Sequence, residues 1–240
     1  MIFFKSFGPP DYSDKSNFLS PRCGPWDFFL HLHRHAILSS LRRAIPCLNG
    51  RLLDIGCGSK PYAEVLHCTE HVGVDVETAR QSTSDSYIQY NGRDLPFGEH
   101  KFDSILCTEV LEHVADLDKT LSEMSRVLKP GGYAFVTVPM VFHHHEEPYD
   151  FRRLTRFGMF SLAEKMDCQV CWLDSRGGVY SVLAGSMHTT LTYTVSKRPF
   201  VDIALLFLWP FCLLLKWFDT LGSQPPPISL GWQMLVRKPI

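Results

Sequence analysis

The 240-residue chain has no excess of charge of either sign. Its 24 lysines and arginines nearly balance 25 aspartates and glutamates, which gives a formal net charge of −1 and a pI of about 6.8. A nucleic-acid-binding surface normally needs a surplus of basic residues, so the composition argues against that class of partner. The chain is also not a polar, low-complexity sequence, because 45% of its residues are hydrophobic and can bury one full core.

The N-terminus lacks the continuous apolar stretch of a secretory signal peptide, because Gly8, Pro9 and Pro10 interrupt it. Cys168 and Cys171 have C-x-x-C spacing, but the chain lacks the second such pair that a zinc site would need. The eight cysteines are scattered, and several fall in apolar runs, which is typical of reduced thiols in a core. These absences predict a cytoplasmic protein.

Hydrophobic periodicity divides the chain in two. Residues 1–50 predict an N-terminal arm and then an amphipathic helix over 26–45, which Pro46 ends. Residues 51–240 predict strands alternating with helices. The expected strands cover 51–55, 71–76, 88–90, 101–107, 133–138, 169–173 and 232–237, and the expected helices cover 61–66, 117–128 and 157–165, with a turn at 129–132. Such alternation is typical of an α/β fold with a parallel sheet, whose ligands bind at the carboxyl ends of the strands.

The stretch LLDIGCGSKPY places two glycines directly after the first expected strand. Gly56 and Gly58 allow a ligand to approach the backbone, as in dinucleotide-binding turns. Asp54 argues against a pyrophosphate, which its carboxylate would repel, and favours a ligand with an ammonium group. Pro61 also occupies the third position of G-x-G-x-x-G, where glycine permits close packing. Asp75 follows Gly56 by nineteen residues, where an acid commonly accepts the hydroxyls of an adenosine ribose.

Four motifs together resemble the class I S-adenosylmethionine-dependent methyltransferases, in particular the group that acts on small molecules. They are LLDIGCGSKPY, VGVDVE, NGRDLPFGEHKFDSILCTEVLEHV and RVLKPGGYAFVTVP, and the resemblance is strong over about 51–138. It implies a Rossmann-like sheet of order 3-2-1-4-5-7-6 with strand 7 antiparallel, and S-adenosyl-L-methionine as the cofactor. A nicotinamide-dependent oxidoreductase is the rival enzyme class, and Asp54 and the DLPF and LKPGG segments oppose it.

The resemblance also implies roles for individual residues. Asp54, Gly56 and Gly58 would line the methionine end of the cofactor, with Asp54 facing the ammonium group directly or through water, and Asp75 would hold the ribose. A second set of residues would complete the site: Asp94 at the adenine amino group, Leu95 beside the adenine ring, and Thr108 and Glu109 near the methionine moiety. Lys60 stands where many members have a further glycine, and this is the departure from the family's pattern in the loop.

The run MVFHHHEEPYDFRRLT follows the fifth expected strand and predicts a loop that binds the acceptor. It resembles the pattern H-x-x-P-x-D-x-x-R-x-T of methyltransferases from polysaccharide clusters, matched here by His145, Pro148, Asp150, Arg153 and Thr155. We expect no metal here, because adjacent histidines on an extended segment point to opposite faces and no downstream partner is evident.

An acceptor hydroxyl would need a general base. His145 is the first candidate, with His113, His144 and Asp150 as alternatives. Arg152 and Arg153 pair either with an acidic group on the acceptor or with the acids of the same loop.

A hydrophobic insertion over about 179–222 separates the last two expected strands. Its thirteen-residue run IALLFLWPFCLLL would form a helix of about 20 Å, shorter than the ~30 Å hydrocarbon core of a bilayer, and Pro210 interrupts it. Segment 199–218 therefore predicts contact with a membrane surface, while a homodimer interface or a lid over the sheet explains the same composition.

The sequence thus favours a methyltransferase that acts on a hydroxyl of a sugar, glycolipid or other lipid-linked molecule, peripheral on the cytoplasmic membrane face. A membrane-tethered protein that binds the cofactor without turnover is the alternative outside enzymes.

Overall fold

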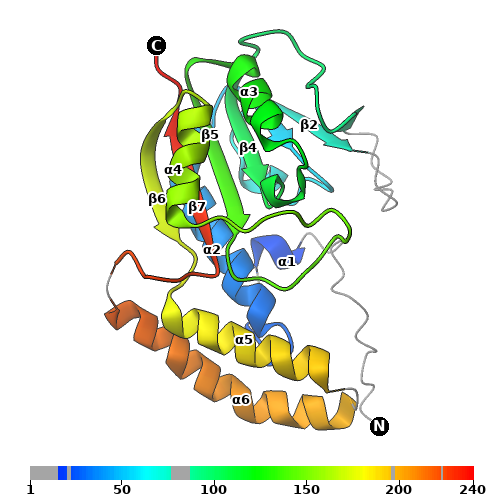
Figure 1. Cartoon of the computed structure of the whole chain (residues 1–240), viewed down its shortest axis with the longest axis vertical. Helices are drawn as coiled ribbons and strands as arrows, with labels where there is room; N and C mark the ends of the chain where they lie inside the picture. The colour runs from blue at the N-terminus through cyan, green and yellow to red at the C-terminus, as the bar shows by residue number, and fades with distance from the viewer. Residues whose placement is uncertain (1–15, 21–22, 77–86, 196–197, 223) are drawn as a thin grey trace.

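The computed structural model describes residues 16–20, 23–76, 87–195, 198–222 and 224–240 (Figure 1). The arm predicted around Gly8 to Pro10 lies outside these residues. The described strands form one sheet of order β3-β2-β1-β4-β5-β7-β6. They are β1 (Arg51–Ile55), β2 (Glu70–Val76), β3 (Tyr87–Tyr90), β4 (Phe102–Thr108), β5 (Leu128–Pro139), β6 (Gln169–Ser175) and β7 (Gly231–Arg237).

The directions of the strands confirm the predicted topology. Strands β3, β2, β1, β4 and β5 pair in parallel, whereas β7 runs antiparallel to both β5 and β6. The carboxyl ends of the parallel strands therefore meet at one edge, which is where open α/β sheets bind their ligands.

Helices cover both faces of the sheet. Helices α3 (Leu117–Val127) and α4 (Arg156–Lys165) pack on one face, where Leu121, Met124 and Met159 join the buried residues of the strands. Helix α2 (Phe28–Ala44) covers the other face through a stripe that includes Leu41 and is followed by the turn η1 (Ile45–Cys47). Helix α1 (Ser16–Leu19) lies beside α2. Arg34 of α2 is buried, and its guanidinium lies 4.1 Å from the centre of the Phe18 ring of α1.

Helices α5 (Val179–Thr194) and α6 (Arg198–Phe218) form a hairpin between β6 and β7. Figure 1 shows the two helices side by side, at the end of the molecule toward which β5 points. The first half of α2 holds the hairpin, because Phe28, Phe29 and Leu32 share a buried cluster with Ala184 of α5 and Cys212 of α6. Helix α2 is therefore the element that joins the hairpin to the sheet.

Three local predictions were wrong. Residues 61–66 form only the short turn η2 (Ala63–Val65), because the backbone is already extended at Leu66, with φ −84° and ψ 133°. Of these six residues only Tyr62 and Leu66 are buried. Residues 129–132 belong to β5, whose pairing with β4 shifts register there. The apolar run of the insertion lies within one 21-residue helix that continues through Pro210.

Candidate active site

The glycine turn after β1 has the conformation that a close ligand approach requires. Gly56 and Gly58 have φ of +65° and +47°, which favour glycine. A Cβ on Gly56 would meet Val110 at 2.3 Å, whereas a Cβ on Gly58 would have nothing within 4 Å. Open space therefore borders Gly58. Lys60 adopts φ +52°, so this lysine takes the left-handed conformation that favours glycine.

Asp75 at the end of β2 closes this turn. Its Oδ2 accepts a hydrogen bond from the Gly58 amide at 2.8 Å, and its Oδ1 accepts one from the Val76 amide at 2.8 Å. Burial raises the pKa of Asp75, and the two amides oppose that rise. A carboxylate offers about four acceptor positions, so two remain for the hydroxyls that the resemblance places here.

Asp54 has a partner that the sequence analysis missed. Its carboxylate is buried, and Oδ2 lies 2.9 Å from Nε2 of His71 on the neighbouring strand β2. Burial raises the pKa of Asp54, while the hydrogen bond from His71 and the charge of Lys60 lower it. The contact of Asp54 with the ammonium group of a ligand stays a prediction. The contact that the structure shows is the hydrogen bond with His71, which links β1 to β2.

The adenine end of the predicted site lies between β3 and α3. Asp94 is exposed, and its Oδ1 lies 3.0 Å from Nζ of Lys119 while Oδ2 accepts a hydrogen bond from Asn91 at 3.2 Å. The hydrogen bond from Lys119 is the main reason that the pKa of Asp94 is lowered. Leu95 is buried, and its amide donates to Oε2 of Glu123 at 2.9 Å. The turn that carries both predicted adenine contacts is thus anchored to α3.

Thr108 and Glu109 lie where β4 ends, as predicted, and Glu109 adopts φ +55°. Arg176, fully buried after β6, donates two hydrogen bonds to the Glu109 carboxylate, at 2.8 and 2.6 Å. Thr137 donates a third at 2.8 Å. Burial alone would raise the pKa of Glu109, but the charge and hydrogen bonds of Arg176 outweigh burial and lower it. The ends of β4, β5 and β6 are joined by this ion pair.

Two predicted base candidates meet at the same edge. His113, in the turn η3 (Leu111–His113), and His145, in the loop after β5, approach each other with 3.1 Å between their Nε2 atoms. Burial, followed by the charge of His113, lowers the pKa of His145. Glu112 completes the group with Oε1 3.6 Å from Nε2 of His113 and 3.9 Å from Nε2 of His145. The sequence analysis did not single out Glu112.

Asp150 holds the acceptor loop together through an ion pair and a backbone hydrogen bond. Its carboxylate forms a two-pronged ion pair with Arg153 and accepts a hydrogen bond from the His145 amide at 3.2 Å. The hydrogen bonds from Arg153 hold its pKa well below the usual range, which makes Asp150 a poor proton acceptor. Arg152 donates to the carbonyl of Leu111 at 2.7 Å. Both arginines are thus occupied within the protein.

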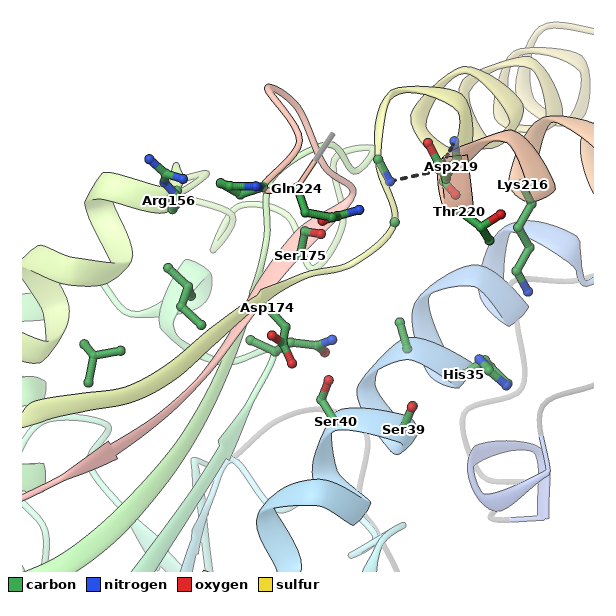
Figure 2. A pocket seen from close by; sticks show the side chains of 18 of the residues that line it. His35, Ser39, Ser40, Arg156, Asp174, Ser175, Lys216, Asp219, Thr220 and Gln224 are labelled. Atoms are coloured by element: carbon green, nitrogen blue, oxygen red, sulfur yellow. Dashed lines mark hydrogen bonds between the residues drawn. The ribbon is translucent and has the colours of Figure 1, made fainter. Parts of the chain in front are cut away.

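A separate cavity of about 890 Å³ lies on the outer side of β6, between α2 and the end of α6 (Figure 2). No predicted site residue lines this cavity. Asp219 lines this cavity, and its carboxylate accepts hydrogen bonds from the amides of Gly178, Tyr180 and Ser181 at 2.7 to 3.0 Å. A carboxylate at a helix N-terminus stabilises that helix. Asp219 therefore connects the end of α6 to the start of α5. Because none of the predicted site residues lines this cavity, the candidate active site remains at the carboxyl edge of the sheet.

Comparison with known proteins identifies the domain. Residues 53–136 match the family model described as "Methyltransferase domain". This segment is similar to a methyltransferase domain. It contains Asp54, both turn glycines, Asp75 and Glu109.

Curated relatives match part of the chain. A ubiquinone biosynthesis O-methyltransferase of Brucella anthropi is 39% identical over 101 residues, which are 36% of this chain and 40% of the relative. A demethylmenaquinone methyltransferase of Symbiobacterium thermophilum is 28% identical over 168 residues, or 63% of each chain. The alignments thus span less than two thirds of these relatives.

Solved structures show the same fold. An S-adenosylmethionine-dependent methyltransferase of Archaeoglobus fulgidus superposes with a TM-score of 0.54 at 16% identity, covering 88% of this chain and 99% of that one. Phosphoethanolamine N-methyltransferase 2 of Haemonchus contortus, in complex with S-adenosyl-L-methionine, gives 0.52 at 19% identity and covers 85% and 52%. The predicted fold is therefore confirmed, and the family match over residues 53–136 agrees with the predicted enzyme class.

The residues at the carboxyl edge suit this cofactor. The open space at Gly58 and the spare acceptor capacity of Asp75 fit a ribose, and the exposed carboxylate of Asp94 can accept a hydrogen bond from an amino group in addition to its pair with Lys119. These assignments of single residues stay proposals.

Proposed function

We propose that this protein transfers the methyl group of S-adenosylmethionine to a hydroxyl oxygen of a small, lipid-linked acceptor presented at a membrane surface. The oxygen acceptor is favoured by the relative named as an O-methyltransferase. The membrane is favoured by the outer face of α6, and this face is the observation that carries the proposal.

Helix α6 exposes an apolar stripe along its whole length. The stripe recurs every three or four residues and consists of Phe200, Ile203, Phe207, Phe211, Leu214, Trp217 and Leu221, the last in the turn η4 (Asp219–Leu221). The opposite face is also apolar but is buried, because Val201, Leu205 and Cys212 pack inward. A single soluble chain rarely exposes a continuous stripe of this kind, and an interfacial helix does.

The length of α6 corrects the prediction that it is too short to cross a bilayer. Its 21 residues span about 32 Å, and the segment Pro199–Leu221 is long and apolar enough to cross, although 22% of its most apolar part is buried inside the protein. The inward face packs against α2 and α5, so crossing would break those contacts. We therefore assign α6 to the surface of the bilayer, with its stripe among the lipids.

The hairpin touches the acceptor loop directly. The Tyr193 hydroxyl at the end of α5 lies 3.2 Å from Nε2 of His143. Phe142 of the loop also packs against the buried cluster that includes Ala184 of α5 and Cys212 of α6. A lipid-linked molecule held by the bilayer beneath α6 would therefore present its head group to the loop that contains His145. This proximity supports one combined site for anchoring and transfer.

The bound cofactor supplies a methyl group on a positively charged sulfur, which is already activated for transfer. The protein has to align donor and acceptor, a proximity effect worth up to ~7 to 11 kcal/mol. Asp75 and the glycine turn would hold the donor at the end of β1. The Glu109–Arg176 pair fixes the neighbouring edge, and the group of Glu112, His113 and His145 faces the acceptor and activates its hydroxyl.

Vesicle flotation combined with methyl transfer tests the proposal. The purified protein should float with anionic phospholipid vesicles and should transfer labelled methyl groups into the organic-soluble part of a membrane extract. Phe207 is 82% exposed and Leu214 is 47% exposed. The double variant Phe207→Asp with Leu214→Asp places two charges in the stripe and should stay in the aqueous layer. Phe157→Asp is the matched control, because Phe157 is 71% exposed but lies on α4.

Other outcomes would redirect the proposal. A wild-type protein that remains soluble but forms a dimer that the double variant dissociates would show that the stripe is a subunit interface. Flotation with S-adenosylhomocysteine binding, but without transfer to any extract, would favour the non-catalytic alternative.

A further inference from the structure

Three polar side chains meet at the carboxyl edge of the sheet, and no arrangement of hydrogen bonds among them satisfies all three. Glu112, His113 and His145 each offer one ligand atom, and the three atoms lie within 4.8 Å of one another. Two come from the turn after β4, and the third comes from the loop after β5. The sheet thus brings together residues that are separated by more than thirty positions.

The tautomers of the two histidines follow from their backbone partners. Nδ1 of His113 lies 2.8 Å from the Tyr149 carbonyl, and Nδ1 of His145 lies 3.2 Å from the His143 carbonyl. A carbonyl only accepts, so each Nδ1 carries a hydrogen. In the neutral rings both Nε2 atoms then present lone pairs to each other across 3.1 Å. Something positive is needed between them.

Glu112 adds a second buried group that lacks a partner within the described part of the chain. The residue is 1% exposed, and neither carboxylate oxygen has a hydrogen-bond partner among the described residues. An uncompensated buried carboxylate costs several kcal/mol. A proton shared by the histidines would leave Oε1 of Glu112 at 3.6 and 3.9 Å, beyond hydrogen-bond distance. A divalent cation would neutralise the carboxylate and use both nitrogen lone pairs.

The distances fit one ion. Two nitrogens 3.1 Å apart, each about 2.1 Å from a common cation, subtend about 95° at it. Two ligands of one ion are separated by at most about 4.2 Å at that bond length, and the distances from Oε1 of Glu112 stay below this limit. Imidazole nitrogens with one carboxylate suit zinc, iron or other first-row transition ions better than magnesium or calcium.

We propose that Glu112, His113 and His145 bind a divalent first-row transition cation. The backbone carbonyls of Tyr149 and His143 fix the two rings, and the Asp150 carboxylate holds the His145 backbone, so groups outside the ligand set orient it. The expectation of a loop without metal considered only partners downstream of the histidines. The partners lie upstream, at the end of β4, and only His145 of the three consecutive histidines joins them.

The three protein ligands leave coordination positions open, as catalytic metal sites do. This role, unlike cation binding itself, rests on the proposed function. The acceptor hydroxyl would bind at an open position and lose its proton to water, as a Lewis acid promotes. Its oxygen would form the bond to the methyl carbon while the carbon–sulfur bond breaks and leaves its electron pair on sulfur. The histidines would then be ligands, and the cation would replace a free imidazole base.

Cobalt titration of the chelator-treated protein tests the site, with absorption bands of bound Co²⁺ and calorimetry as readouts that need no acceptor. We expect one Co²⁺ per chain and a rise in melting temperature, with Zn²⁺ displacing it. Glu112→Gln and His145→Ala should each weaken binding at least ~10- to 100-fold, the loss that even outer partners of a metal cause. His144→Ala is the matched control, because its side chain is 85% exposed and outside the group.

No Co²⁺ or Zn²⁺ binding by the folded wild-type protein would overturn the proposal, as would equal binding by the Glu112→Gln and His145→Ala variants. Calorimetry with S-adenosylhomocysteine, run on the metal-free protein, separates this failure from failure of the donor site. The donor should bind there whether or not the cation site exists.

Discussion

Arg176 is the residue on which the carboxyl edge depends most. It is fully buried, and its guanidinium contacts Glu109 at the end of β4 and lies 3.0 Å from Nδ1 of His33 in α2. Burial, followed by the charge of Arg176, lowers the pKa of His33, so this imidazole accepts the hydrogen bond in its neutral form. One side chain thus links the sheet edge to the helix that holds the hairpin.

Replacing Arg176 with methionine should lower the free energy of unfolding by about 3 to 5 kcal/mol, because Glu109 loses its buried counter-charge. Urea unfolding followed by circular dichroism measures the change. The double variant Glu109→Gln with Arg176→Met is the control and should recover part of the loss, because it removes both charges. An Arg176→Met variant as stable as the wild type would contradict the role of this ion pair.

Single residues were predictable where a motif encodes a backbone requirement. Gly56 and Gly58 were found because a strand followed by alternating glycines indicates a ligand turn, and both have positive φ. Arg176 and Glu112 were missed for a different reason. Their partners come from other strands, so neither spacing nor composition reveals that Arg176 meets Glu109 or that Glu112 meets His145.

At the scale of elements, α3 secures the turn that carries Asp94 and Leu95. Glu123 of α3 accepts hydrogen bonds from the Leu95 amide at 2.9 Å and from Arg126 at 2.7 and 2.9 Å. The hydrogen bonds of Arg126 lower the pKa of Glu123 to about 2. The helix is therefore fastened to the predicted adenine turn by one ionised carboxylate.

Stability should fall in acid through Glu123. Its pKa is lower in the folded state than in the unfolded state, so its contribution is present above the unfolded value of about 4.3 and is lost as pH falls toward 2. Glu123→Gln should therefore cost about 2 kcal/mol at pH 7 and progressively less below pH 4. Urea unfolding at several pH values measures this difference, which must shrink in acid. A difference that is constant between pH 7 and pH 3 would contradict the assignment.

Elements with strong periodicity were predicted well, and elements decided by tertiary contacts were not. Helix α3 begins at Leu117 as its apolar spacing predicts, and its N-cap Asp116 accepts from the Lys119 amide at 3.2 Å. Helix α6 continues through Pro210 because its inward face packs on α2 and α5, a contact that the local sequence does not encode. Proline within a helix costs about 3 kcal/mol, which packing along 21 residues offsets here.

For the whole molecule, the sheet order was available from the family resemblance, but the position of the insertion was not. The hairpin could have covered an outer face or the outer strand β6. The contact of Tyr193 with His143 and the packing of Phe142 on the cluster shared with α5 and α6 place it beside the acceptor loop instead. This arrangement joins an apolar surface to the polar carboxyl edge, as the proposed transfer to a lipid-linked hydroxyl requires.

Calorimetric titration with S-adenosylhomocysteine, and separately with NAD, tests the donor site on which the whole account depends. The account predicts saturable binding of one S-adenosylhomocysteine per chain and no binding of NAD. Asp75→Ala should abolish that binding, and Asp103→Ala should preserve it, because the Asp103 carboxylate pairs with Lys129 at the opposite end of the sheet. Binding of NAD alone, or S-adenosylhomocysteine binding that survives in Asp75→Ala, would contradict the account.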